Sequence, residues 1–338
     1  MTAPAQKRIV VFRVGSIGDT VVALPCFHTV RRAFPDAHIT LLTTVPTSTK
    51  AAPLMMILGQ DGSFVDDVID YPGGLSSPLE AAKLALRLRR VGANTLVYMM
   101  PVRSAKGLKR DAMFFRLAGF RNILCIPKGE AQRVSRVDTH AGVVEPEAQR
   151  LARCLSPLGE TDLRDRAQWD MRLSEAERAE GTRLAAQVPA PFLALNTGGK
   201  VASKDWGFDR WAELLARFRA RTEAPGLMLV GAPDDADRAA ALIEAWGDGG
   251  VSLCGGPNPR EAAAALSHAR LFLGHDSGPL HLAQCVGTPA LGLFGDYNKP
   301  VQWHPIGSHV SVLHELQGID AITVDQVLDR AFEMWTAQ

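Results

Sequence analysis

The sequence predicts an α/β protein with two consecutive domains, each built on a parallel sheet. Three observations support this. A strand over 8–12, a glycine-containing turn with a helix ending near Phe34-Pro35, and a strand over 38–44 form the βαβ unit of a parallel sheet. Strand-like and helical stretches then alternate along the chain. A second alternating set begins with a strand over 192–196.

The first set continues beyond the βαβ unit. Its strands are expected at 65–71, 95–100, 122–126 and 168–173, with a helix over 78–91. Ser174 and Glu177 then form a capping box, which predicts a helix that reaches about Val188. We place the division between the domains here, so that the first covers 1–172 and the second 173–322.

The second set has the same alternation. Further strands are expected at 227–230, at 251–254 and near Leu271. Four apolar residues recur at i, i+3, i+4 and i+7 and predict the buried face of a helix: Trp211, Leu214, Leu215 and Phe218. Thr323 and Gln326 cap a final helix, 323–338, which we expect to pack back near the domain interface.

The overall composition indicates a soluble globular protein without a broad affinity for nucleic acid. The chain has 338 residues, 46% of them hydrophobic, and a formal net charge of +1. Its five cysteines are scattered and include no CxxC pair, which argues against a disulfide framework or a thiolate metal site. No segment approaches the length of an apolar membrane span. These features predict a cytoplasmic protein.

Positive charge is concentrated between residues 101 and 136. Nine Lys or Arg stand there against two acidic residues, a net charge of +7, so the rest of the chain carries −6. A solvated helical face explains this distribution without any function. The alternative is a patch for an acidic acceptor or an anionic membrane surface.

Asp19 ends the turn Val14–Asp19, which reads VGSIGD. The turn lacks the GxGxxG pattern of dinucleotide-binding folds, which disfavours a dehydrogenase. It places a carboxylate at the carboxyl edge of the first strand, where ligands of open α/β sheets bind. The plain alternative is an acidic residue that complements the helix dipole.

A second turn carries Asp276, Ser277 and Gly278 and leads into a helix with Pro279 at its start. The helix is expected to stop at Gly287. Free amides and the positive end of the helix dipole favour an anion at such a turn. An ordinary strand-turn-helix connection explains the same residues equally well.

Three segments together resemble the ADP-heptose:lipopolysaccharide heptosyltransferases, glycosyltransferase family nine. They are Arg13 with SIGD and Pro25, then Ser203–Trp206 (SKDW), and then the stretch DSGPLHLAQCVGTPALGLFG that begins at Asp276. A weaker element is His140. The resemblance implies the GT-B fold: two facing Rossmann-like domains with parallel sheets and a ligand cleft between them.

The resemblance also implies roles for individual residues. Asp19 would be the general base, and Lys204 would stabilise the leaving diphosphate. The implied donor-binding residues are Asp276, Ser277, Gly278, Pro279, His281, Lys200, Asp234 and Asp235, and one of Asp234, Asp235 and Asp237 would contact the ribose. The implied acceptor-binding residues are Ser16, Gly18, Arg103, Arg110, Arg116 and Arg136. Neither a metal nor a cofactor is required.

The implied function is inverting transfer of a heptose from ADP-L-glycero-D-manno-heptose to an acidic lipopolysaccharide core acceptor. The partners are then a nucleotide-diphosphate sugar and an acidic glycolipid, with a peripheral contact at the cytoplasmic face of the inner membrane. Departures from the family pattern at Gly199, Lys200 and Lys299 leave donor recognition open. The alternatives are a family-nine transferase with another nucleotide sugar or another glycan or protein acceptor, a GT-B nucleotide-sugar epimerase, and a non-catalytic sugar-nucleotide binding protein.

Overall fold

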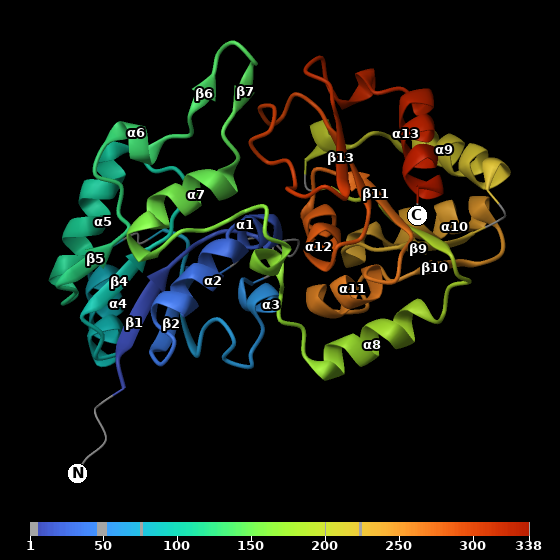
Figure 1. The fold of residues 1–338 in the computed structure, drawn as a ribbon. Coiled ribbons are helices and arrows are strands. Elements are labelled where there is room, and N and C mark those ends of the chain that lie inside the picture. Colours follow the sequence, from blue (N-terminus) through green and yellow to red (C-terminus); the bar gives the residue numbers. More distant parts are fainter. Residues whose placement is uncertain (1–5, 46–52, 75–76, 200, 223–224, 338) are drawn as a thin grey trace. The chain divides into compact units, whose positions relative to one another are not determined.

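A computed structural model describes residues 6–45, 53–74, 77–199, 201–222 and 225–337. The chain divides into two compact α/β units, Met1–Leu163 and Arg164–Gln338 (Figure 1). The division predicted after residue 172 falls inside the second unit. No helix of the described residues is long and apolar enough to cross a bilayer.

The N-terminal unit contains a parallel sheet with the strand order β3-β2-β1-β4-β5. Its strands are β1 (Arg8–Phe12), β2 (His38–Thr44), β3 (Asp67–Tyr71), β4 (Thr95–Tyr98) and β5 (Asn122–Leu124). Val10 of β1 pairs with Thr40 of β2 on one side and Leu96 of β4 on the other. The run Ile9–Val11 is fully buried, as expected of a strand covered on both faces.

Helices cover both faces of this sheet. They are α1 (Ile17–Val22), α2 (Leu24–Ala33), α3 (Met55–Leu58), α4 (Pro78–Arg90), α5 (Ala105–Leu117), α6 (Glu130–Arg133) and α7 (Glu147–Leu155). The helix expected to run to Phe34 is broken at Ala23. Pro25 explains the break, because its ring would clash with the carbonyl of Val21 in a continuous helix.

The segment predicted as a strand over 168–173 is not a strand. Residues Arg166–Trp169 form a 3₁₀ turn, which Asp165 starts by accepting a hydrogen bond from the N–H of Ala167. The carbonyls of Met171 and Arg172 accept hydrogen bonds from the Arg260 guanidinium, at 2.7 and 2.8 Å, in place of a neighbouring strand. A short antiparallel hairpin of β6 (Val137–Asp138) and β7 (Val143–Val144) was also not expected.

The C-terminal unit contains a six-stranded parallel sheet with the order β10-β9-β8-β11-β12-β13. Its strands are β8 (Phe192–Asn196), β9 (Gly226–Leu229), β10 (Gly250–Ser252), β11 (Leu271–His275), β12 (Ala290–Phe294) and β13 (Val310–His314). Sequence reasoning missed β13, an edge strand that pairs with β12. The carboxyl ends of the neighbouring strands β8 and β11 carry the SKDW and DSG segments.

The helices of this unit match most expectations. They are α8 (Glu175–Ala185), α9 (Phe208–Arg221), α10 (Ala236–Trp246), α11 (Pro259–Leu266), α12 (Gly278–Val286) and α13 (Val324–Thr336). The capping boxes at Ser174 and Thr323 are formed, and Gly287 ends α12 with a φ of 74°. The final helix packs on α9, where the rings of Phe218 and Trp335 lie 5.4 Å apart.

Candidate active site

Asp19 lies in the first turn of α1, close to the carboxyl end of β1. Its Oδ2 accepts hydrogen bonds from the main-chain N–H of Ser16 at 2.8 Å and from the Ser16 hydroxyl at 2.9 Å. Among the residues that the structure describes, none donates to the other oxygen, Oδ1. One oxygen therefore holds the turn, and the second is available to a ligand proton. Gly18 belongs to the same turn.

Two neighbours fix the position of Asp19. A Cβ at Gly15 would lie 2.4 Å from the Cβ of Asp19, so only glycine fits there. Arg13 is fully buried and donates to the main-chain carbonyls of Asp19 at 2.6 Å and Met99 at 3.3 Å. Burial lowers the pKa of Arg13, and the negative charges of Asp19 and Glu147 counteract that effect.

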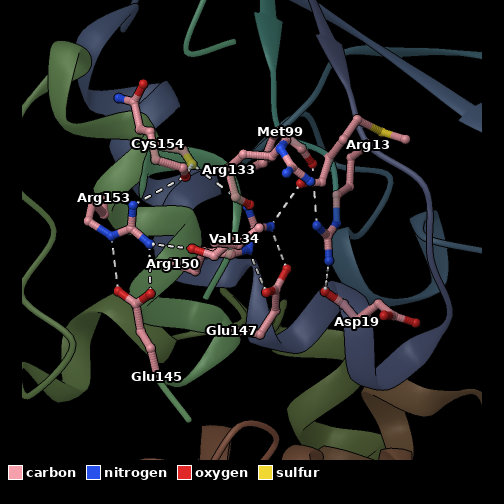
Figure 2. A network of polar contacts seen from close by, with 12 residues as sticks. Arg13, Asp19, Met99, Arg133, Val134, Glu145, Glu147, Arg150, Arg153 and Cys154 are labelled. Atoms are coloured by element: carbon pink, nitrogen blue, oxygen red, sulfur yellow. Dashed lines mark hydrogen bonds and ion pairs between the residues drawn. The ribbon is translucent and has the colours of Figure 1, made fainter. Parts of the chain in front are cut away.

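A second buried arginine, Arg150 of α7, forms an ion pair with Glu147 (Figure 2). The side chains are 1% and 3% exposed, and the two bonds between them measure 2.6 and 2.7 Å. Arg150 also donates to the carbonyl of Met100 at 2.9 Å, next to the residue that Arg13 binds. The network thus ties α7 to the end of β4 and, through Arg13, to the Asp19 turn.

The four predicted acceptor arginines do not gather at one point. Arg103 and Arg110 both approach the buried carboxylate of Asp111, at 3.8 and 3.1 Å. Arg116 lies six residues beyond Arg110 on α5, about 9 Å along the helix axis. Arg136 is exposed before the hairpin and donates its N–H to Glu145 at 2.9 Å. Asp111 therefore neutralises part of the basic segment.

In the C-terminal unit, Lys204 and Asp276 form an ion pair of 2.6 Å. Lys204 ends a 3₁₀ turn after β8, and Asp276 follows β11, so the adjacent ends of two parallel strands bring them together. Their side chains are 17% and 10% exposed. Asn298 also donates to Asp276, and the Lys204 ammonium lies 4.4 Å from the centre of the Tyr297 ring.

The N-terminus of α12 lies directly beside this ion pair. The hydroxyl of Ser277 donates to Asn196 at 2.8 Å and makes no capping bond to the helix. Within the described part of the chain, no side chain caps the first amides of α12. Pro279 occupies the first turn, as predicted. Gly278 opens the helix. This end of α12 can therefore receive an anion.

His275 connects the SKDW segment to β11. The ring is fully buried, and its Nε2 accepts hydrogen bonds of 3.1 Å from the Trp206 N–H and from the Trp211 indole N–H. Burial lowers the pKa of His275 to about 4. Because Nε2 accepts twice, the proton of the neutral ring lies on Nδ1. Acidification would convert Nε2 into a donor and oppose both bonds.

We expect this histidine to make stability depend on pH. A depressed folded-state pKa gives stability that is present above pH 6.5 and is lost as the pH falls toward about 4. The free energy of unfolding should fall by about 3 kcal/mol over this pH range. Urea unfolding followed by tryptophan fluorescence measures it. In His275→Gln, which keeps an acceptor but does not titrate, this loss should disappear; an unchanged pH dependence in the variant contradicts the assignment. His140→Gln, at an exposed position, is the matched control and should leave the loss unchanged.

The structure describes three of the four remaining predicted donor-binding residues. Asp235 accepts from the N–H of Ala232 at 2.8 Å and lies against Gly198, where a Cβ would be 2.2 Å from its carboxyl carbon. It therefore packs on the loop that follows β8. Asp234 is exposed, and His281 is buried in α12. Lys200 lies outside the described residues.

Several site residues escaped sequence reasoning. Arg238 makes a two-pronged ion pair of 2.6 and 2.9 Å with Asp205 and so holds the SKDW turn. Asn196 and Asn298 fix Ser277 and Asp276. The one available signal was Asn196, a polar residue that ends the apolar strand FLALN. In the described ranges, no three His, Cys, Asp or Glu side chains are placed to hold a metal ion.

The chain has the GT-B fold of solved family-nine structures. A glycosyltransferase family 9 protein of Veillonella parvula superposes with a TM-score of 0.75, at 19% identity over all of both chains. E. coli heptosyltransferase WaaC with ADP-2-deoxy-2-fluoro heptose gives 0.69, at 16% identity over 96% of this chain and 99% of that one. The predicted α/β, GT-B fold class with its parallel sheets is confirmed.

The chain belongs to glycosyltransferase family 9 (heptosyltransferase), whose family model matches residues 106–322. It is similar to lipopolysaccharide heptosyltransferase 3 of Escherichia coli K12, with 26% identity over 300 residues that cover 85% of this chain and 82% of the relative. The resemblance seen in the sequence is therefore confirmed, and the protein is a glycosyltransferase.

Proposed function

We propose that the protein transfers a heptose from ADP-L-glycero-D-manno-heptose to an acidic lipopolysaccharide core acceptor, with inversion in a single displacement. The observation that carries the proposal is the Lys204–Asp276 ion pair beside the uncapped start of α12. A cation, a carboxylate and helix amides at one sheet edge suit a ligand that joins a diphosphate to a polyhydroxylated sugar. The relatives' names supply the heptose and the ADP.

In this proposal the leaving diphosphate binds Lys204 and the amides of Ser277 and Gly278. Negative charge develops on the diphosphate as the glycosidic bond breaks, so a positioned cation and helix dipole lower the barrier. Asp276 then accepts hydrogen bonds from the sugar hydroxyls. Asp235, at the carboxyl end of β9, is our preferred ribose contact, because it lies against the loop that carries Lys204.

Asp19 is the proposed general base. Its Oδ1 takes the proton from an acceptor hydroxyl while that oxygen forms the new bond to the anomeric carbon, and the diphosphate leaves with the bonding electron pair. Ser16 holds Oδ2 and so directs the second oxygen toward the acceptor. The scheme needs neither a metal nor a cofactor. His281 supports the loop and takes no part in proton transfer.

The acceptor is proposed to be an acidic glycolipid at the cytoplasmic face of the inner membrane. Arg103, Arg110, Arg116 and Arg136 supply the positive charge that meets its carboxylate and phosphate groups. Of these, Arg110 and Arg116 are the sharpest targets for a test, because Arg110 is 69% exposed and Arg116 is also exposed on α5.

The donor assignment predicts a nucleotide preference. ADP should raise the unfolding temperature more than UDP or GDP, and a concentration of 100 times Kd adds about 2.7 kcal/mol of stability. Thermal shifts measure this, followed by transfer assays with the stabilising donor. Lys204→Gln should remove most of the ADP effect, whereas Lys128→Gln, an exposed lysine on another segment, should retain it. Stabilisation by UDP and not by ADP would contradict the heptosyl donor.

The acceptor assignment predicts a selective kinetic defect. Arg110→Glu with Arg116→Glu should raise the acceptor KM about tenfold or more, because opposed charges replace two attractive ones. Donor-induced thermal stabilisation should not change. Lys7→Glu with Arg8→Glu, which alters charge equally at exposed positions outside the basic segment, serves as the control. Equal acceptor KM values for the two double variants would remove these arginines from the acceptor site.

A further inference from the structure

The outer faces of α4 and α5 combine exposed apolar side chains with positive charge. Of the twelve large apolar side chains that are exposed among the described residues, four lie on these two helices: Leu79 (64% exposed), Leu86 (49%), Met113 (61%) and Leu117 (65%). The helices also carry eight Lys or Arg against two acidic residues, Glu80 and Asp111, and Asp111 is buried.

The two helices form one surface. Both pack on the same face of the N-terminal sheet, where Leu84 and Leu88 of α4 share a core with Leu108 and Phe115 of α5. Figure 1 shows them as neighbours, and the Arg89 guanidinium of α4 donates to the carbonyl of Leu117 at 2.6 Å. Their outward faces therefore point away from the same side of the sheet.

The exposed apolar residues stand among the charges. On α5, Met113 and Leu117 are four residues apart and lie on one face of the helix. Lys106, Lys109, Arg110 and Arg116 surround them on the same exposed side. On α4, Leu79 and Leu86 share the outward face with Lys83 and Arg90. A sugar acceptor alone gives no reason to expose four large apolar side chains.

We propose that this α4–α5 surface docks the protein on an anionic lipid bilayer. Lysine and arginine at a membrane surface attract anionic headgroups, and apolar side chains between them enter the boundary of the acyl chains. The inference deepens the proposed function, because it rests on an acceptor embedded in a membrane. It names the surface that meets the lipid, and α5 then carries both lipid contacts and the acceptor arginines.

Sedimentation of the full chain with vesicles tests this docking without donor or acceptor. The wild type should bind vesicles that contain phosphatidylglycerol and should not bind pure phosphatidylcholine. Met113→Ser with Leu117→Ser should lower the partition coefficient about tenfold or more at both low and high salt. Lys83→Gln with Lys109→Gln should lower it roughly 30-fold, about fivefold for each charge, and at low salt only. Lys7→Gln with Arg330→Gln, off both helices and outside the basic segment, is the matched control.

The outcomes separate docking from catalysis. Wild-type protein that stays in the supernatant with anionic vesicles overturns the docking surface, as does equal binding by all three double variants. The docking surface is also overturned if the wild type forms a dimer, does not bind vesicles, and loses the dimer on Met113→Ser with Leu117→Ser. That result would show that a second copy of the chain covers this face. Transfer to an acceptor stripped of its acyl chains should be unchanged in the Met113 and Leu117 variant. If the wild type and all variants bind vesicles but none of them transfers a sugar, the proposed function is contradicted and the docking surface is not.

Discussion

Asp19→Asn is expected to reduce heptosyl transfer about 10²- to 10⁴-fold while donor binding is retained. The amide keeps the size of the side chain and an acceptor for Ser16, but it cannot take the proton of an acceptor hydroxyl. The turn should therefore survive, and the chemical step should fail. Initial rates of transfer at saturating donor, together with ADP-induced thermal shifts, separate the two effects.

The matched control for this substitution is Asp36→Asn, an exposed carboxylate in the same unit. That variant should transfer heptose at the wild-type rate. If Asp19→Asn retains more than about a tenth of the wild-type rate, the proton acceptor must be another group. Loss of the ADP shift along with transfer would instead indicate that the substitution disturbs the fold.

Glu147→Gln is expected to lower the free energy of unfolding by about 3–5 kcal/mol. The substitution leaves the Arg150 guanidinium buried at 1% exposure without its charged partner, and it removes a charge that also favours Arg13. Urea unfolding at neutral pH measures the loss. Glu130→Gln is the control, because that side chain is 81% exposed and lies 3.7 Å from Arg133. It should cost no more than about 0.5 kcal/mol.

A double substitution shows whether the cost comes from the unpaired charge. Glu147→Leu with Arg150→Met replaces both buried ions by apolar side chains, and it should be much less destabilising than Glu147→Gln alone. If the double variant is less stable than the single one, then the hydrogen bonds of Arg150 to Met100 and Arg133, rather than the ion pair, dominate the stability of this region.

The fold was largely predictable, since each central strand is apolar and the helices carry recognisable caps. Ser174 with Glu177 and Thr323 with Gln326 formed the bonds that their spacing predicts. The failures have local causes. Pro25 breaks a helix that the sequence predicted to be continuous. The carbonyls at 171–172 accept hydrogen bonds from Arg260 rather than from a neighbouring strand. That arginine is too far along the chain for local patterns to indicate.

The candidate site was predictable in its motif residues only. Lys204 and Asp276 lie 72 positions apart in the sequence, and the order of strands β8 and β11 brings them into contact. Their supports could not be predicted, because Arg238 and Asn298 look like ordinary surface residues in the sequence. Likewise, Glu147 and Arg150 at i, i+3 have the spacing of a solvated pair on a helix surface, yet both are buried.

The contact between Lys204 and Asp276 has a consequence for product release in the proposed reaction. When the sugar nucleotide is bound, Lys204 pairs with the diphosphate instead of Asp276. The Asp276 carboxylate then accepts hydrogen bonds from the sugar hydroxyls in place of its bond to the lysine. Transfer carries the sugar away but leaves the diphosphate in place. Asp276 then competes again for the Lys204 ammonium, which the free nucleotide must share. The enzyme would thus hold its spent nucleotide less tightly than the intact donor, and turnover would not stall on ADP.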